Sequence, residues 1–175
     1  QGTIMEEQST ELIEESSSEL PTQEETTTSG LEQNVCSVDI DPTKPMVALT
    51  FDDGPARNTT SRLLDTLELY GAHATFYVVG YNIPGNEDII KRASEIGCEI
   101  GNHSTGHQKL IDLDDAGVIG AIQPIADQVK ALTNQKVVTC RPPFGSIDER
   151  VQNIVAAPII LWSVDTLDWK TKNTE

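Results

Sequence analysis

Short apolar runs and helically spaced apolar positions alternate along residues 45–164 of this chain. The runs predict buried strands, and apolar residues spaced three or four apart predict helices between them. The predicted strands are 46–51, 74–79, 98–101, 137–140 and 159–164, and the predicted helices are 59–69, 87–96, 114–132 and 147–155. This alternation predicts the α/β class, with a parallel sheet covered by helices. We expect an incomplete barrel of about five β/α units rather than an open doubly wound sheet.

The first 35 residues differ in composition from the rest of the chain. They contain nine Glu, no Asp, Lys or Arg and no aromatic residue, and they are rich in Ser and Thr. Because so little apolar surface cannot offset the conformational entropy lost on folding, we expect residues 1–35 to be a disordered linker. Two hypotheses remain open for it, a stalk leading to a tether upstream of residue 1 and a tail without a specific role. Residues 36–175 would then form the N-terminal and larger part of a folded domain.

The net charge narrows the classes of partner. The chain has 12 Lys and Arg against 28 Asp and Glu, a formal net charge of -16. Nucleic-acid binders carry a basic footprint, and anionic membrane surfaces attract basic segments, so neither partner is expected. No apolar run is long enough to span a bilayer, and we therefore expect no direct membrane insertion. The three cysteines are not spaced as metal ligands.

Residues with chemically useful side chains follow the predicted strands. The carboxyl ends of parallel strands meet at one rim, where α/β proteins carry their active sites. Four strand ends contribute acidic, imidazole, guanidinium or indole groups: Asp52 and Asp53, His103 and His107, Arg141, and the segment 165–169.

Two imidazoles and one carboxylate form a common ligand set for a divalent metal ion, with positions left for water and substrate. Because Asp52 and Asp53 are adjacent, one can bind the metal while the other acts as a general base toward water. Such a site is suited to hydrolysis of an amide or an ester. A His-x-x-x-His spacing alone is weak evidence, because histidines in a polar loop are often only solvated. Its combination with the Asp pair favours the metal hypothesis, whereas His73, in a turn, is expected to be structural.

Four segments resemble, in order and spacing, the motifs of the carbohydrate esterase family 4 polysaccharide deacetylases, which share the NodB homology domain. They are Thr50–Pro55, His103–His107, Arg141–Phe144 and Asp165–Trp169. The resemblance covers about residues 44–175. It implies a distorted (β/α) barrel, usually of seven strands, and is strongest to bacterial peptidoglycan N-acetylglucosamine deacetylases.

The resemblance also implies a role for each residue of the metal site. Asp52 would be the general base, and Arg141 would hold its carboxylate in place in the ionised form. The metal ligands would be Asp53, His103 and His107. Zinc is the metal that the resemblance implies, with cobalt and nickel as alternatives.

The other motif residues would contact substrate or orient the site. The backbone N–H of Phe144 would stabilise the oxyanion, Trp169 would form a wall of the acetyl pocket or sugar groove, and Asp168 would have an orienting role. The family also carries a Leu-x-His motif whose histidine is the general acid, and no histidine of this chain matches it. We therefore expect a second polypeptide fragment that completes the domain and supplies this histidine.

The function implied by the resemblance is metal-dependent removal of acetyl groups from N-acetylglucosamine in a cell-wall polysaccharide, outside a bacterial cell. Three alternatives stay open: an O-acetyl xylan esterase, a chitin-oligosaccharide deacetylase and a non-catalytic glycan-binding relative. Comparing N-acetyl with O-acetyl substrates separates the O-acetyl xylan esterase from the enzymes that remove N-acetyl groups. Binding of glycan and metal without release of acetate would identify the last.

Overall fold

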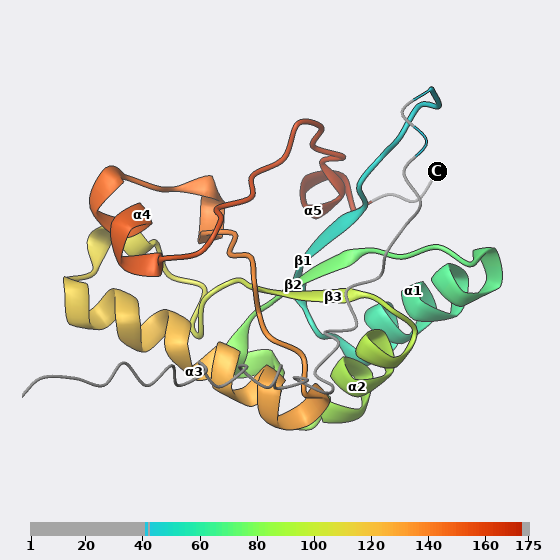
Figure 1. Cartoon of the computed structure of the whole chain (residues 1–175), viewed down its shortest axis with the longest axis horizontal. Helices are drawn as coiled ribbons and strands as arrows, with labels where there is room; N and C mark the ends of the chain where they lie inside the picture. Colours follow the sequence, from blue (N-terminus) through green and yellow to red (C-terminus); the bar gives the residue numbers. More distant parts are fainter. Residues whose placement is uncertain (1–40, 42, 173–175) are drawn as a thin grey trace, which may run out of the picture. The chain divides into compact units, whose positions relative to one another are not determined.

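The computed structural model describes residues 41 and 43–172, and the expected linker at 1–35 lies outside the described residues. Three parallel strands, β1 (Thr50–Gly54), β2 (Thr75–Val78) and β3 (Glu99–Asn102), lie side by side in that order (Figure 1). The helices are α1 (Arg57–Tyr70), α2 (Glu87–Glu95), α3 (Asp115–Thr133), α4 (Glu149–Val155) and α5 (Asp168–Thr171). Short 3-10 helices occur at Gly80–Asn82, Leu110–Asp112 and Pro143–Gly145. The parallel α/β class predicted from the sequence is confirmed.

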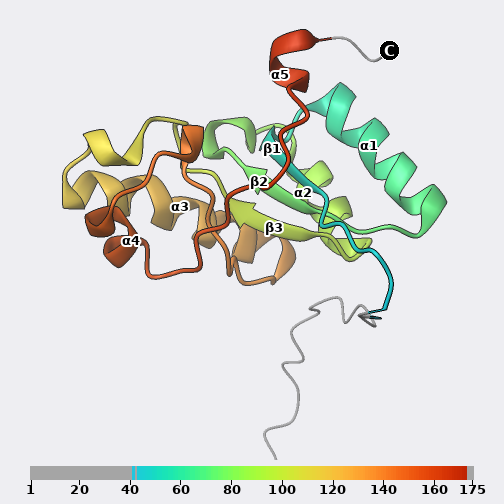
Figure 2. The ribbon, with the colours of Figure 1, turned by 90° about the horizontal axis from the view of Figure 1, so that it is seen from above.

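The predicted strands 137–140 and 159–164 are much shorter than expected. Cys140 forms an isolated parallel bridge with Asn102 of β3, and Ile159 forms one with Cys140. These bridges continue the sheet order in the direction expected of a partial barrel. Seen from above in Figure 2, the chain between α4 and α5 passes over the sheet. The expectation of about five strand units is therefore corrected to three strands and two single-residue bridges within the described residues.

The first strand begins later than predicted. The apolar run from Met46 predicted a buried strand, but β1 starts at Thr50, whose partner Thr75 is the first residue of β2. Met46 and Val47 precede this pairing and are exposed. The strand instead continues through Asp52 and Asp53, where its register with β2 shifts between Phe51 and Gly54, so both carboxylates are carried by β1 at an irregularity in the pairing.

The two faces of the sheet differ in polarity. Phe76 and Val78 of β2 and Ile100 of β3 point into the apolar core, together with the inner faces of α1, α2 and α3. Side chains alternate along a strand, so the intervening residues occupy the opposite face. There the carboxylate of Glu99 accepts hydrogen bonds from the hydroxyls of Thr75 and Thr139, at 3.4 and 2.5 Å. The polar face is the one that leads to the strand-end side chains.

Local signals set the helix ends close to the predicted positions. Gly71 has φ 58° and ends α1 in the left-handed conformation that glycine adopts without steric cost. The side chains of Asp114 and Asp148 accept hydrogen bonds from the N–H groups of Gly117 and Val151, and so cap α3 and α4. Among the described residues, no helix combines the length and the apolar character needed to cross a membrane.

The core predicts a strong contrast between two isoleucines of α3. Ile125 is 0% exposed and belongs to the main core, whereas Ile119 is 55% exposed. Ile125→Ala is expected to lower the free energy of unfolding by about 2–5 kcal/mol, because it leaves a cavity. Ile119→Ala, the matched control, is expected to lower it by less than about 1 kcal/mol. Urea unfolding followed by circular dichroism measures both, and equal losses would contradict this packing.

Candidate metal centre

The structure brings the three expected metal ligands together at the carboxyl end of the sheet. Asp53 Oδ1 lies 3.5 Å from His103 Nε2 and 3.1 Å from His107 Nε2. Asp53 is carried by β1, and both histidines follow β3. One ligand atom from each residue lies within 4.8 Å of the other two. We refer to Asp53, His103 and His107 together as the metal group. The four-residue spacing therefore places both imidazoles beside a carboxylate from another strand.

These distances fit a single small divalent ion. Two nitrogen or oxygen ligands that each lie about 2.0–2.1 Å from a tetrahedral ion are about 3.3 Å apart. The two distances from Asp53 lie on either side of that value. The Asp53 side chain is 67% exposed, so the group is open to solvent on the carboxylate side. A catalytic metal site needs such an open position for water and substrate.

His103 is prepared to bind through Nε2. It is 3% exposed, and its Nδ1 lies 2.6 Å from the backbone oxygen of Arg141, which can only accept a hydrogen bond. This bond places the proton on Nδ1 and leaves the Nε2 lone pair directed at Asp53. Burial lowers the pKa of His103 below its ordinary value, although its bond to Arg141 and the nearby carboxylates raise it. The imidazole is therefore neutral near pH 7, as a metal ligand must be.

The loop between the two histidines is fixed from inside. The buried side chain of Asn102 accepts a hydrogen bond from Ser104 N at 2.9 Å and donates to the backbone oxygen of Ile122 in α3 at 2.8 Å. Ser104 Oγ in turn accepts a hydrogen bond from His107 N. Ser104 and His107 have φ values of 64° and 53°, which are costly for residues other than glycine. Such strain persists only where surrounding contacts hold it, and here they fix the direction of His107.

Asp52 points to the same site but has a different partner. Its Oδ1 accepts a hydrogen bond from Arg141 Nη1 at 2.7 Å, while its Oδ2 lies 3.9 Å from His103 Nε2. The Arg141 side chain is 3% exposed, whereas that of Asp52 is 31% exposed. Asp52 therefore offers a carboxylate oxygen beside the metal group, fixed from behind by a buried cation.

Phe144 lies at the edge of this group in a left-handed conformation, with φ 62°. Its side chain is 62% exposed, and its ring centroid is 4.8 Å from that of His107. The ammonium of Lys109 lies 5.9 Å from the Phe144 ring centroid. The structure thus places Phe144 next to a metal ligand, and its expected backbone role stays a prediction.

Asp168 and Trp169 are not joined to the metal group. They lie on α5, where Asp168 accepts a hydrogen bond from the hydroxyl of Thr166 and Trp169 is 65% exposed. Within residues 41 and 43–172, no hydrogen bond, ion pair or ring contact links either side chain to the ligands. Their expected orienting and pocket-wall roles are therefore predictions without a contact in this structure.

Two aromatic residues near the site were missed by the sequence analysis. Tyr77 of β2 and Trp162 lie with their ring centroids 4.2 and 5.7 Å from Cζ of Arg141. Strand alternation could have indicated Tyr77, because it must face away from Phe76 and its core neighbours. No local pattern marks Trp162, since its position depends on where the chain returns after α4.

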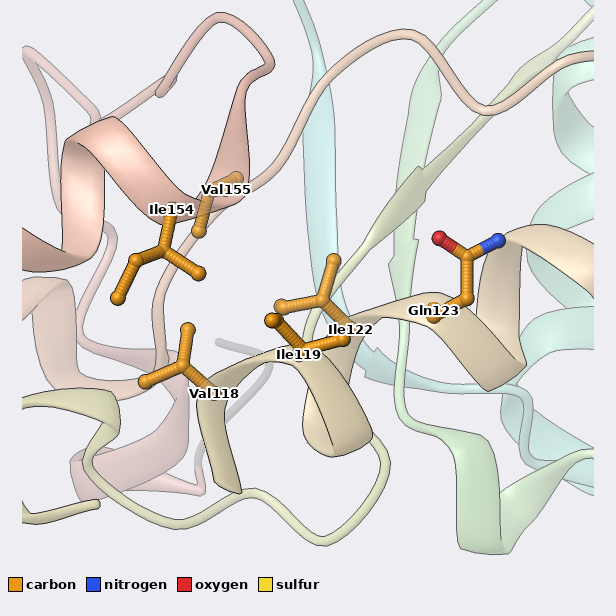
Figure 3. Close-up of a pocket in the computed structure, with 6 residues that line it drawn as sticks. All are labelled: Val118, Ile119, Ile122, Gln123, Ile154 and Val155. Atoms are coloured by element: carbon orange, nitrogen blue, oxygen red, sulfur yellow. The ribbon is translucent and has the colours of Figure 1, made fainter. Parts of the chain in front are cut away.

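The pocket shown in Figure 3 is separate from this chemistry. It lies between α3 and α4 and contains no titratable side chain. Its lining residues are Val118, Ile119, Ile122, Gln123, Ile154 and Val155. The metal group instead lies at the carboxyl ends of β1 and β3, on the open rim of the sheet.

A parallel sheet with metal-type ligands at its strand ends is typical of metal-dependent α/β enzymes, and comparison with known proteins gives the family. The polysaccharide deacetylase family model matches residues 39–157, so the chain belongs to this family. It is 39% identical over 131 residues to peptidoglycan-N-acetylglucosamine deacetylase PgdA of Listeria monocytogenes. It is 35% identical over 134 residues to peptidoglycan-N-acetylmuramic acid deacetylase PdaC of Bacillus subtilis. These matches cover 75% and 77% of this chain but 28% and 29% of the two relatives.

Solved structures give the same result for the fold. The structure of peptidoglycan deacetylase PdaC from Bacillus subtilis matches with a TM-score of 0.74 and 35% identity, over 77% of this chain and 66% of that one. A family 4 pseudoenzyme from Bacillus anthracis also matches, with a TM-score of 0.68 and 32% identity, over 74% of this chain and 47% of that one. The partial-barrel fold and the family resemblance drawn from the sequence are both confirmed.

Proposed function

We propose that this chain carries the metal ligands and general base of an enzyme that removes acetyl groups from N-acetylglucosamine in peptidoglycan. The observation that carries the proposal is the convergence of Asp53, His103 and His107 beside the carboxylate of Asp52. Family membership supports the reaction class, and the names of the relatives from Listeria monocytogenes and Bacillus subtilis support the polymer.

The residues divide the work of amide hydrolysis. A divalent ion held by Asp53, His103 and His107 would polarise the acetyl carbonyl and increase the acidity of water. The exposed oxygen of Asp52 takes a proton from the attacking water, while Arg141 holds the other oxygen. A C–O bond forms, the C–N bond breaks, and acetate and a sugar amine are released once the nitrogen accepts a proton. The N–H of Phe144 is proposed to stabilise the oxyanion, Trp169 to line the acetyl pocket and Asp168 to orient the site.

We propose that the proton for the amine comes from a donor other than Asp52. His103 and His107 belong to the metal group, and His73 Nδ1 lies 3.1 Å from the backbone oxygen of Ile96, away from the site. We propose that a histidine outside these 175 residues, on a second polypeptide fragment, supplies this proton. The exposed apolar side chains of Leu161 and Trp162, next to Arg141, offer a surface for such a fragment.

Zinc is the proposed metal, because imidazole and carboxylate ligands in a small open site suit it, and cobalt and nickel share these ligand preferences. The proposed location is the outside of a bacterial cell, where peptidoglycan lies. A non-catalytic glycan-binding role is the second candidate. It is favoured by the similarity to the pseudoenzyme from Bacillus anthracis.

Metal removal tests the proposed function. The assay uses the chain combined with the fragment that supplies the histidine. After treatment of this preparation with a chelator, release of acetate from N-acetylated peptidoglycan is expected to fall to background, because Asp52 alone cannot activate the amide carbonyl. Zinc, cobalt or nickel added back should restore it, as measured by an enzyme-coupled acetate assay. Acetylated xylan and chitin oligosaccharide, assayed in parallel, identify the preferred polymer. Activity that survives complete metal removal would contradict the mechanism, and glycan binding without any acetate release would favour the second candidate.

A further inference from the structure

The guanidinium of Arg141 is fixed at its edges by four hydrogen bonds. Nη1 donates to Asp52 Oδ1 at 2.7 Å and to Thr50 Oγ1 at 2.9 Å. The other two nitrogens donate to backbone oxygens, Nε to Ile160 and Nη2 to Leu161, both at 2.9 Å. The Asp52 contact uses one nitrogen rather than a bidentate pair. Its direction therefore depends on how the whole guanidinium plane is held.

Two aromatic rings of unequal exposure lie close to this guanidinium. Cζ of Arg141 lies 4.2 Å from the ring centroid of Tyr77 and 5.7 Å from that of Trp162. Tyr77 is 1% exposed, whereas Trp162 is 44% exposed. Both distances are within the range of a cation–π interaction, but the closer and drier contact is the stronger one. Tyr77 is thus the main support of the guanidinium face.

The Tyr77 ring is itself held in one position. It shares a face of the sheet with its partner Gly101 in β3. A Cβ atom at Gly101 would lie 2.5 Å from ring atoms Cδ1 and Cε1, so the ring rests directly on the glycine backbone. Burial raises the pKa of the Tyr77 phenol, whose hydroxyl faces Thr139, and Thr139 is bonded to Glu99. The position of the Tyr77 ring is therefore fixed by contacts other than the one with Arg141.

We propose that Tyr77 is a positioning residue whose ring fixes the plane of the Arg141 guanidinium, so that Nη1 faces Asp52. This inference rests on the proposed function, in which Asp52 is the general base. Tyr77 touches neither substrate nor metal in this arrangement and acts only through Arg141. Without the ring, the guanidinium can tilt about its two backbone contacts, and the Asp52 carboxylate loses its fixed direction.

Kinetics in the full chain, in the preparation used for acetate release, test this role. Tyr77→Leu is expected to lower kcat about ten-fold with KM changed less than about two-fold, since supporting residues of this kind act on orientation. Tyr77→Phe keeps the ring and should stay within about two-fold of the unchanged protein. Phe76→Leu is the matched control, because Phe76 is an adjacent buried ring that faces the opposite side. It should lose stability but keep kcat.

Two kinetic results would overturn the proposal. If Phe76→Leu lowers kcat as much as Tyr77→Leu, the effect is a general loss of packing. If Tyr77→Phe loses as much as Tyr77→Leu, the phenol hydroxyl and not the ring is what matters. Zinc affinity, measured by titration calorimetry, should be the same in all three variants.

A measurement that needs no catalysis separates this proposal from the proposed function. The Nε–H of Arg141 donates to Ile160, and its hydrogen exchange can be followed by nitrogen-15 NMR. Tyr77→Leu should accelerate this exchange at least about ten-fold, while Tyr77→Phe and Phe76→Leu should not. Unchanged exchange in Tyr77→Leu would overturn the proposal even in an active enzyme. If the unchanged protein releases no acetate, the proposed function fails and the exchange result alone decides the role of Tyr77.

Discussion

Asp52→Asn is expected to lower acetate release by about 10²–10⁴-fold while leaving metal affinity nearly unchanged. The amide side chain has almost the same shape as the carboxylate and can still accept the hydrogen bond from Arg141 Nη1. It cannot, however, take a proton from water. Because Asp52 is 3.9 Å from His103 and outside the three-ligand group, zinc should still bind. Acetate release and titration calorimetry on the same sample measure the two effects.

The control for this substitution is Asp112→Asn. Asp112 is exposed and lies on the 3-10 helix Leu110–Asp112, shortly after His107. Its substitution therefore tests for a general effect of removing one negative charge. It should keep full activity. Equal activity of Asp52→Asn and the unchanged protein would show that another group activates water. A large loss of zinc affinity would instead show that Asp52 is a ligand.

His107→Ala is expected to weaken zinc binding by more than about 100-fold and to abolish acetate release. Removing a supporting residue around a metal typically costs 10–100-fold in affinity, so removing a ligand should cost more. His107 Nε2 lies 3.1 Å from Asp53, and its side chain is 24% exposed, so the substitution removes a ligand without opening the core. Titration calorimetry measures the affinity, and thermal unfolding without metal checks the fold.

His73→Ala provides the matched imidazole control. His73 Nδ1 contacts the backbone oxygen of Ile96, far along the chain from the ligands, and its removal should leave zinc affinity unchanged. If His73→Ala and His107→Ala weaken zinc binding equally, the metal group defined by the structure is not the binding site. Zinc binding by His107→Ala with full affinity would have the same meaning.

Much of the fold could be predicted because its signals are local. Gly71 ends α1, and aspartate side chains cap α3 and α4. The alternation of apolar runs with helically spaced apolar positions predicted the parallel sheet. The errors fall where pairing depends on distant partners. Met46 and Val47 look like a buried strand by composition, but β2 begins opposite Thr50, so neither residue has a strand partner in the described part of the chain. Periodicity alone cannot fix where a neighbouring strand starts.

The candidate site shows the same division. Asp53 and His103 could be brought together from the sequence, because the ends of parallel strands share one rim. The supports of these ligands could not be predicted in the same way. Asn102 and Ser104 act through a loop with left-handed residues, and Trp162 depends on the return of the chain after α4. Such contacts follow from the folded path of the backbone rather than from spacing.

Arg141 contributes to both halves of the site at once. Its backbone oxygen accepts a hydrogen bond from His103 Nδ1, and its Nη1 donates one to Asp52 Oδ1. Under the proposed function, a change in the path of the chain at this position would disturb metal binding and proton removal together. Conversely, a relative that lost the guanidinium but kept the backbone path could still retain its ion after it had ceased to turn over substrate.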